Sequence, residues 1–144
     1  MNLGTELELI IRLIIAAVLG GMIGMERESA HKPAGLRTHV FVSMGSALFT
    51  VLAIQAIAYV PNITDFNPLQ MLGSILVGVG FIGGGVIMHQ ERDVKNITTA
   101  AGIWMSSGIG IAVGMGAYVL AITAVILSLL TLLSLQRFKS DSET

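Results

Sequence analysis

Long apolar runs constrain this chain more than any other feature of its sequence. Three runs in the first 88 residues are each long enough to cross a bilayer as a helix, which takes about 17 to 25 residues. A fourth tract, 97–135, is too long for one crossing and is divided by the stretch GMGAY. We therefore expect an all-α integral membrane protein with about five transmembrane helices, which the sequence places at about 7–25, 40–60, 69–88, 97–114 and 117–136.

The composition fits a protein that meets lipid over most of its surface. Charged residues make up 12% of the chain and hydrophobic residues 53%, whereas a soluble domain carries about 25% charged residues. The net charge of −1 favours no nucleic-acid partner. Glu6 and Glu8 precede the first apolar run, where a cleaved signal would carry basic residues. We expect the first helix to be retained and the partner of the whole chain to be a bilayer.

Lysine and arginine in the short loops orient the helices. In a five-helix arrangement seven basic residues fall on one side, and positive charge marks the cytoplasmic side. The predicted topology is N-out and C-in, with residues 140–144 as a short polar cytoplasmic tail. The seven residues are Arg27, Lys32, Arg37, Arg92, Lys95, Arg137 and Lys139.

Glycines at 78, 80 and 83 spell G-x-G-x-x-G. A dinucleotide fingerprint needs a strand before it and an acidic residue about 20 positions later, but the nearest acids, Glu91 and Asp93, are too close. Small residues in membrane helices instead allow close packing of helices. We expect the helices at 7–25, 69–88 and 97–114 to form a tight core, and the chain to form a homo-oligomer, with a dimer favoured. The small residues spaced for packing are Ala16, Gly20, Gly24, Gly80, Gly84, Gly102, Ser106, Gly110 and Gly114.

Arg12 lies inside the first apolar run, where a charge is a candidate functional site. Glu8 stands one turn earlier and offers a favourable pair, and a residue near the membrane edge can snorkel to water. Anchoring and function both stay open for Arg12.

Polar residues gather where the helices meet the cytoplasmic edge. Glu26 is a natural partner for Arg37, and Asp93 or Asn96 can cap the helix that begins near residue 97, whose free N–H groups would form an anion site with Lys95 and Arg92. Ordinary loops and caps are the alternative. The predicted cytoplasmic-edge cluster comprises Glu26, Arg37, Thr38, His39, Asn96, Thr98 and Thr99.

The three histidines lack the spacing of metal ligands. No nucleophile stands with a base, and the chain has no cysteine. We expect no cofactor, no metal site and no enzymatic activity.

Four blocks of sequence resemble the MgtC/SapB family of bacterial inner-membrane proteins, in order and in spacing. They reach over most of the chain to about residue 135. The blocks are RLIIAAVLGGMIGMERE (12–28), AGLRTHVFVSMGSALFT (34–50), GFIGGGVIM (80–88) and VKNITTAAGIWMSSGIG (94–110).

The resemblance implies a role in growth at low magnesium, in acid or phosphate stress and in virulence. It also implies a mode of action, inhibition of the F-type ATP synthase through its membrane sector. Arg12, Glu26, Arg37, Thr38 and Thr99 fall in the family's most recognisable motifs. Many members carry an ACT-like cytoplasmic domain after the last helix, and we expect none here.

Three hypotheses therefore compete. The chain is a regulator that docks on another membrane complex, a transporter or channel for a small ion or anion with its site at the Arg37 cluster, or a purely structural subunit.

Overall fold

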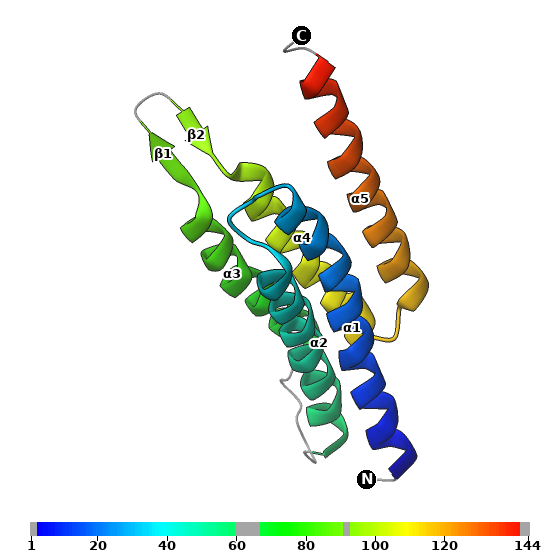
Figure 1. Cartoon of the computed structure of the whole chain (residues 1–144). Helices are drawn as coiled ribbons and strands as arrows, with labels where there is room; N and C mark the ends of the chain where they lie inside the picture. Colours follow the sequence, from blue (N-terminus) through cyan, green and yellow to red (C-terminus); the bar gives the residue numbers. More distant parts are fainter. Residues whose placement is uncertain (1–2, 60–66, 91–92, 142–144) are drawn as a thin grey trace.

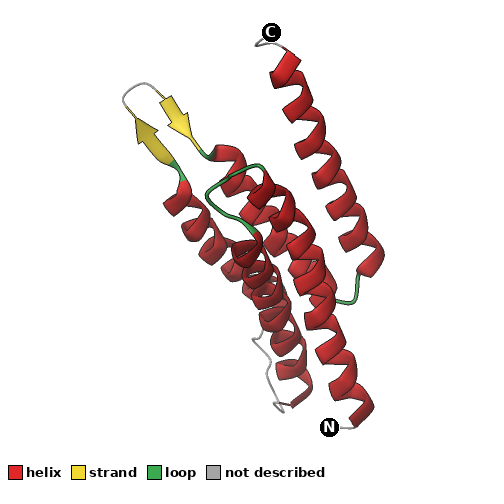
Figure 2. Ribbon diagram, viewed as in Figure 1, coloured by secondary structure: helices red, strands yellow, loops and turns green. Residues whose placement is uncertain are grey.

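In the residues that the structure describes, the protein is a bundle of five helices with one short hairpin. The computed structural model describes residues 3–59, 67–90 and 93–141. Figure 1 shows the helices running up and down along one common direction, and Figure 2 shows how little of the described chain lies outside them. The helices are α1 (Leu3–Ser29), α2 (Leu36–Tyr59), α3 (Pro68–Val86), α4 (Ile97–Gly114) and α5 (Tyr118–Asp141).

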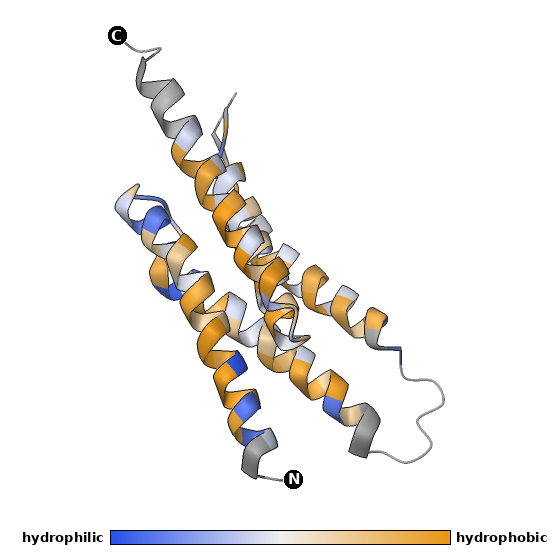
Figure 3. Ribbon diagram, turned by 90° about the vertical axis from the view of Figure 1, so that its right-hand side faces the viewer, coloured by the Kyte–Doolittle hydropathy of each residue, from blue (hydrophilic) through white to orange (hydrophobic). Residues whose placement is uncertain are grey.

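The predicted all-α membrane architecture is confirmed. In the described residues, α1 to α4 are each long and apolar enough to cross a membrane, and α5 has a shorter apolar part at Tyr118–Ser134. Hydrophobic residues cover the helices along most of their length, with polar stretches near the ends (Figure 3). The loop after α1, the hairpin and the C-terminus lie at one end of the molecule, and the N-terminus lies at the other (Figure 1). Because seven of the eight basic residues lie in or next to the loop after α1, the segment between α3 and α4 and the tail, we expect that end to be the cytoplasmic one.

Local signals explain where the helices begin and turn. The Glu28 carboxylate accepts a hydrogen bond of 2.7 Å from the backbone N–H of Leu36, so the last turn of α1 caps the start of α2. Asn67 caps α3 by accepting from the N–H of Leu69, and Pro68 follows in the first turn. The turn between α4 and α5 needs only three residues because Gly116 adopts a φ of +81°.

A β-hairpin joins α3 to α4, where we expected a loop and a helix cap. Its strands are β1 (Met88–Gln90) and β2 (Asp93–Lys95), which pair antiparallel with Met88 opposite Lys95. Glu91 and Arg92 lie outside the described residues. Three-residue strands are too short to show the two-residue alternation by which a strand is recognised in sequence.

The core lies where α1, α2 and α4 meet, with α5 packed along α1 and α4. Its buried side chains include Ala16, Ile23, Ala47, Val113 and Val125. This corrects the predicted core: α2 takes the position that we expected α3 to take, and α3 lies at the side of the bundle against α4 and α2 (Figure 1).

Candidate functional site

The small residues of α1 pack against α2. A Cβ added at Gly20 would lie 2.5 Å from the Cβ of Ser43 and 2.6 Å from the carbonyl oxygen of His39. A Cβ at Gly24 would lie 2.7 Å from the Cα of Leu36. Ala16, one turn before Gly20, is fully buried. These positions therefore tolerate no larger side chain unless α2 moves away.

The small residues of α4 pack against the same helix. A Cβ at Gly110 would overlap the carbonyl oxygen of Ser43, and one at Gly114 would lie 2.8 Å from the Cβ of Thr50. Gly102 faces the ring of His39, and Ser106 is buried. Both stripes thus bring their helices close to α2.

The glycines of α3 behave differently. A Cβ added at Gly80 or Gly84 would meet nothing within 4 Å. The predicted packing of these two residues into the core of this chain is therefore wrong. The face of α3 that packs inside the chain carries Val79 and Gly83 instead.

Buried hydroxyl and imidazole groups line the contact between α2 and α4. We call them the polar row. His39 Nδ1 lies 2.7 Å from Ser106 Oγ, and Ser46 Oγ lies 2.8 Å from Ser107 Oγ. The Thr50 hydroxyl donates to the carbonyl of Ser46 at 2.8 Å. The row consists of His39, Ser43, Ser46 and Thr50 on α2 with Ser106 and Ser107 on α4, and each of these side chains is at least 97% buried.

Two atoms of the polar row have no hydrogen-bond partner among the described residues, His39 Nε2 and Ser43 Oγ. The carbonyl of Ala34 lies near the His39 ring, but its geometry does not make it a partner of Nε2. Buried polar groups in proteins almost always have partners. Helix packing alone therefore does not explain why these two polar atoms are buried.

A buried ion pair closes the cytoplasmic end of the row. Arg27 donates from Nε and Nη2 to the two carboxylate oxygens of Glu26, and Arg27 is only 2% exposed. Both charges act on the His39 ring. We had expected Arg37 to be the partner of Glu26 and had counted Arg27 among ordinary loop charges.

Arg37 and Thr38 stand at the rim of the site. The Arg37 side chain is exposed and Thr38 is partly exposed, whereas the next residue, His39, is fully buried. In this region His39 and Arg27 are therefore the buried groups, and Arg37 lies outside them.

The N-terminus of α4 holds the remaining predicted residues. Asn96 occupies the cap position with a φ of +70°, but its side chain makes no capping bond and instead donates to the carbonyl of Val86 at 3.2 Å. The prediction of an Asn96 side-chain cap is wrong. Thr99 is buried and Thr98 is exposed. Arg92, the other cation of the predicted anion site, lies outside the described residues.

Arg12 closes the outer end of the bundle. Its Nη1 donates to the carbonyl of Gly114 at 2.7 Å, and its Nη2 pairs with Glu8 at 2.6 Å. The carbonyl of Gly114 belongs to the last turn of α4, where cations are favoured. Arg12 therefore ties α1 to the end of α4, which is the anchoring role that we had left open.

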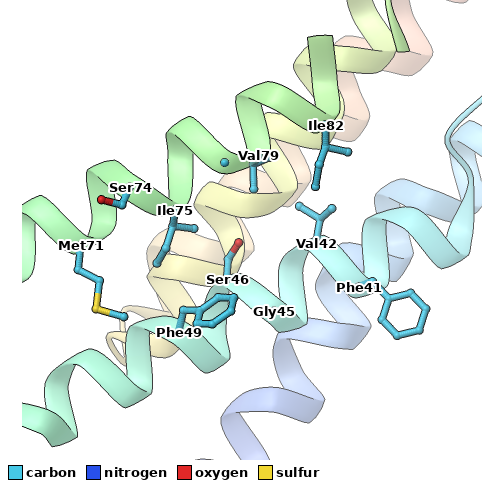
Figure 4. A pocket seen from close by; sticks show the side chains of 11 residues that line it. Phe41, Val42, Gly45, Ser46, Phe49, Met71, Ser74, Ile75, Val79 and Ile82 are labelled. Atoms are coloured by element: carbon cyan, nitrogen blue, oxygen red, sulfur yellow. The ribbon is translucent and has the colours of Figure 1, made fainter. Parts of the chain in front are cut away.

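An apolar groove of about 570 Å³ runs between α2 and α3. Figure 4 shows Val42, Phe49, Ile75 and Val79 around it, with Ser46 among them. The groove separates α3 from α2 over much of its length, whereas α3 packs against α4.

The fold and this interior define a multi-pass helical membrane protein with a polar centre. The chain matches the MgtC family over residues 13–140 and belongs to that family. It is 43% identical over 127 residues to YhiD of Escherichia coli K12, which covers 87% of this chain and 59% of YhiD. It is 39% identical over 114 residues to SapB of Bacillus subtilis, covering 77% of this chain and 49% of SapB. It is 36% identical over 120 residues to MgtC of Salmonella typhimurium 14028s, covering 83% of this chain and 49% of MgtC.

The chain thus spans about half to three fifths of the length of these relatives. No solved structure matches it.

Proposed function

We propose that this protein is a regulator in the bacterial inner membrane that docks through α3 on another membrane complex, the F-type ATP synthase, and lowers its proton flux. Family membership supports the regulatory role, in line with low-magnesium or acid adaptation. One observation carries the docking mode: the outer face of α3 carries three glycines at which an added Cβ would meet nothing within 4 Å.

We call this face the open face of α3, made of Gly73, Val77, Gly80 and Gly84. Their spacing of four, three and four residues puts them on one side of the helix. The three glycines would meet nothing within 4 Å if they gained a Cβ, and Val77 is 76% exposed. Small residues let another helix approach to backbone distance, which is how helices associate in lipid.

The exposed surface of α5 differs from the open face of α3. It presents large aliphatic side chains, among them Val119, Leu120, Leu127 and Leu130. Side chains of this kind suit lipid tails. The open face of α3 offers a partner helix an exposed backbone at its glycines, flanked by the exposed side chains of Val77 and Phe81, so we take it as the docking surface.

The transport hypothesis centred on Arg37 receives less support. That site needs Arg37 to face into the protein together with Glu26, but Arg37 is exposed and Glu26 is bound by Arg27. The regulator therefore stands as the proposal.

Cysteine crosslinking in native membranes tests the docking directly, because the chain contains no cysteine of its own. Val77→Cys places a thiol on the open face of α3, and Val119→Cys places one on α5 with similar exposure. A thiol-to-amine crosslinker should join Val77→Cys, and not Val119→Cys, to a membrane-sector subunit of the ATP synthase.

Crosslinking of Val77→Cys only to a second copy of this chain would make the open face of α3 a homo-oligomer interface and contradict the proposal. Equal crosslinking from both positions would mean random encounter and would contradict it as well.

A further inference from the structure

The polar row has a feature that helix packing does not require. Serines often hold membrane helices together, and a hydroxyl in that role is hydrogen-bonded across the contact. Ser43 Oγ and His39 Nε2 are buried and have no partner among the described residues. Leaving polar atoms unpaired in a membrane interior costs free energy, so their presence points to a use.

The row also connects the two ends of the bundle. From His39 to Thr50 it follows α2 for 11 positions, which is about 16 Å at the rise of an α-helix. Thr50 lies against Gly114, and the carbonyl of Gly114 accepts from Arg12. An Arg–Glu pair stands at each end, Arg27 with Glu26 at the cytoplasmic end and Arg12 with Glu8 at the outer end.

We infer that the polar row is a path for protons through the interior of the protein. Hydroxyl and neutral imidazole groups each donate and accept a hydrogen bond, which is the property that proton relay needs. Intramembrane histidine in such chains is typical of proton relays. The row itself is made of hydroxyls and one imidazole, whereas magnesium is bound through carboxylates, phosphates and retained waters.

Close helix packing favours the proton over a hydrated ion. Gly20 of α1 and Gly110 of α4 bring backbone and Ser43 into direct contact around the middle of the row. Polar neighbours along one face of a helix have their Cβ atoms about 5–6 Å apart. A single water joins two oxygens at roughly that separation, since each hydrogen bond spans about 2.8 Å. In the proposed path, water would join those side chains of the row that are not hydrogen-bonded to one another.

Each transfer conserves protons. A proton from the cytoplasmic side binds His39 Nε2, and the proton on Nδ1 passes to Ser106 Oγ. The hydroxyl proton of Ser106 leaves at the same time towards a bridging water and Ser43, and the Ser46–Ser107 pair repeats the exchange. Thr50 then accepts a proton, and its own hydroxyl proton, which points at the Ser46 carbonyl, turns away and leaves towards the outer end of the bundle. One proton enters and one leaves. Rotation of the hydroxyls and return of the imidazole to its first tautomer restore the row.

This inference is independent of the docking proposal, because it needs no partner protein. The purified protein in liposomes that contain nothing else tests it. A pH gradient is imposed, a potassium diffusion potential clamps the voltage, and an entrapped pH-sensitive dye reports proton entry.

Ser43→Ala is the decisive variant, since its hydroxyl makes no hydrogen bond among the described residues and its loss costs the fold none. Ser128→Ala is the matched control, because that hydroxyl bonds only to its own helix at Ala124. His39→Gln removes the protonatable ring. Wild type and Ser128→Ala should dissipate the gradient faster than empty liposomes, Ser43→Ala should be slower by roughly tenfold, and His39→Gln by more, since a positioned proton-transfer group contributes about 10²–10⁴ in rate.

Wild-type liposomes that hold the gradient as well as empty ones would overturn the inference. A Ser43→Ala protein that conducts like the wild type would also overturn it. Because Ser43→Ala keeps every hydrogen bond of the fold, the result stands even where His39→Gln fails to fold.

Discussion

Gly110 of α4 lies directly against the backbone carbonyl of Ser43 on α2, with no room for a methyl group between them. An added Cβ would overlap the carbonyl oxygen and lie 2.8 Å from its carbon. Because the clash is with backbone, a side-chain rotation cannot relieve it. This contact sets the distance between α2 and α4, and with it the geometry of the polar row.

Gly110→Ala should therefore destabilise the protein. Overpacking of a close contact costs about 1–3 kcal/mol. Gly108→Ala, on the same helix, should instead be neutral or stabilise by up to about 1 kcal/mol, because its Cβ meets nothing within 4 Å and alanine favours a helix. Unfolding in mixed detergent micelles, followed by circular dichroism, compares the two. Equal stabilities would contradict the packing described for Gly110.

The buried pair of Glu26 and Arg27 should matter more for stability than Arg37. Removing one partner of a buried ion pair costs about 3–5 kcal/mol, because the other charge stays buried alone. Glu26→Gln and Arg27→Ala should each lower the unfolding midpoint strongly. Arg37→Ala changes an exposed side chain and should stay within about 0.5 kcal/mol of the wild type. A larger loss of stability in Arg37→Ala than in Arg27→Ala would contradict the importance of the buried pair.

Arg12 should stabilise the protein more through its hydrogen bond to the carbonyl of Gly114 than through its pair with Glu8. Arg12→Ala removes a charged hydrogen bond that joins α1 to α4, which is worth about 1.5–3 kcal/mol. Glu8→Gln breaks a pair whose carboxylate is largely exposed and should cost less than about 1 kcal/mol. The same micelle unfolding assay separates them. Equal losses of stability in the two variants would mean that Arg12 stabilises the protein through its ion pair with Glu8 and not through the carbonyl of Gly114.

The backbone at Asn96 should limit which residues can replace it. Its φ of +70° costs most residues about 1–2 kcal/mol. Asn96→Val should therefore be less stable than Asn96→Gly, although both lose the bond to Val86. If the Asn96→Val protein is as stable as the Asn96→Gly protein, the left-handed backbone at this position does not limit which residue can stand there.

The sequence was sufficient for the parts of the fold that depend on local pattern. Span length predicted the five helices, and four-residue spacing found the packing stripes of α1 and α4. A stripe shows which face packs but does not show the partner. We therefore assigned α3 to the place that α2 occupies.

The site was harder to predict for two reasons. Neighbouring residues on a helix point about 100° apart, so nothing in the sequence indicates that Glu26 binds Arg27 or that the arginine is buried. The polar residues at 39, 43, 46 and 50, by contrast, follow helical spacing. That spacing was a usable signal for the α2 part of the polar row, and we missed it because only His39 stood out by chemistry.

ATP-driven proton pumping in inverted membrane vesicles tests the central claim most directly. The vesicles carry no added protein, the wild type, or one of three variants. Gly80→Leu fills the open face of α3, and Gly108→Leu makes the same change at a glycine of α4 whose Cβ would also meet nothing within 4 Å. Ser43→Ala separates docking from a proton leak through the polar row. The account predicts that wild type, Gly108→Leu and Ser43→Ala lower pumping and ATP hydrolysis together, and that Gly80→Leu restores both. Unchanged pumping with the wild type, or a Gly80→Leu protein as inhibitory as the wild type, would contradict it.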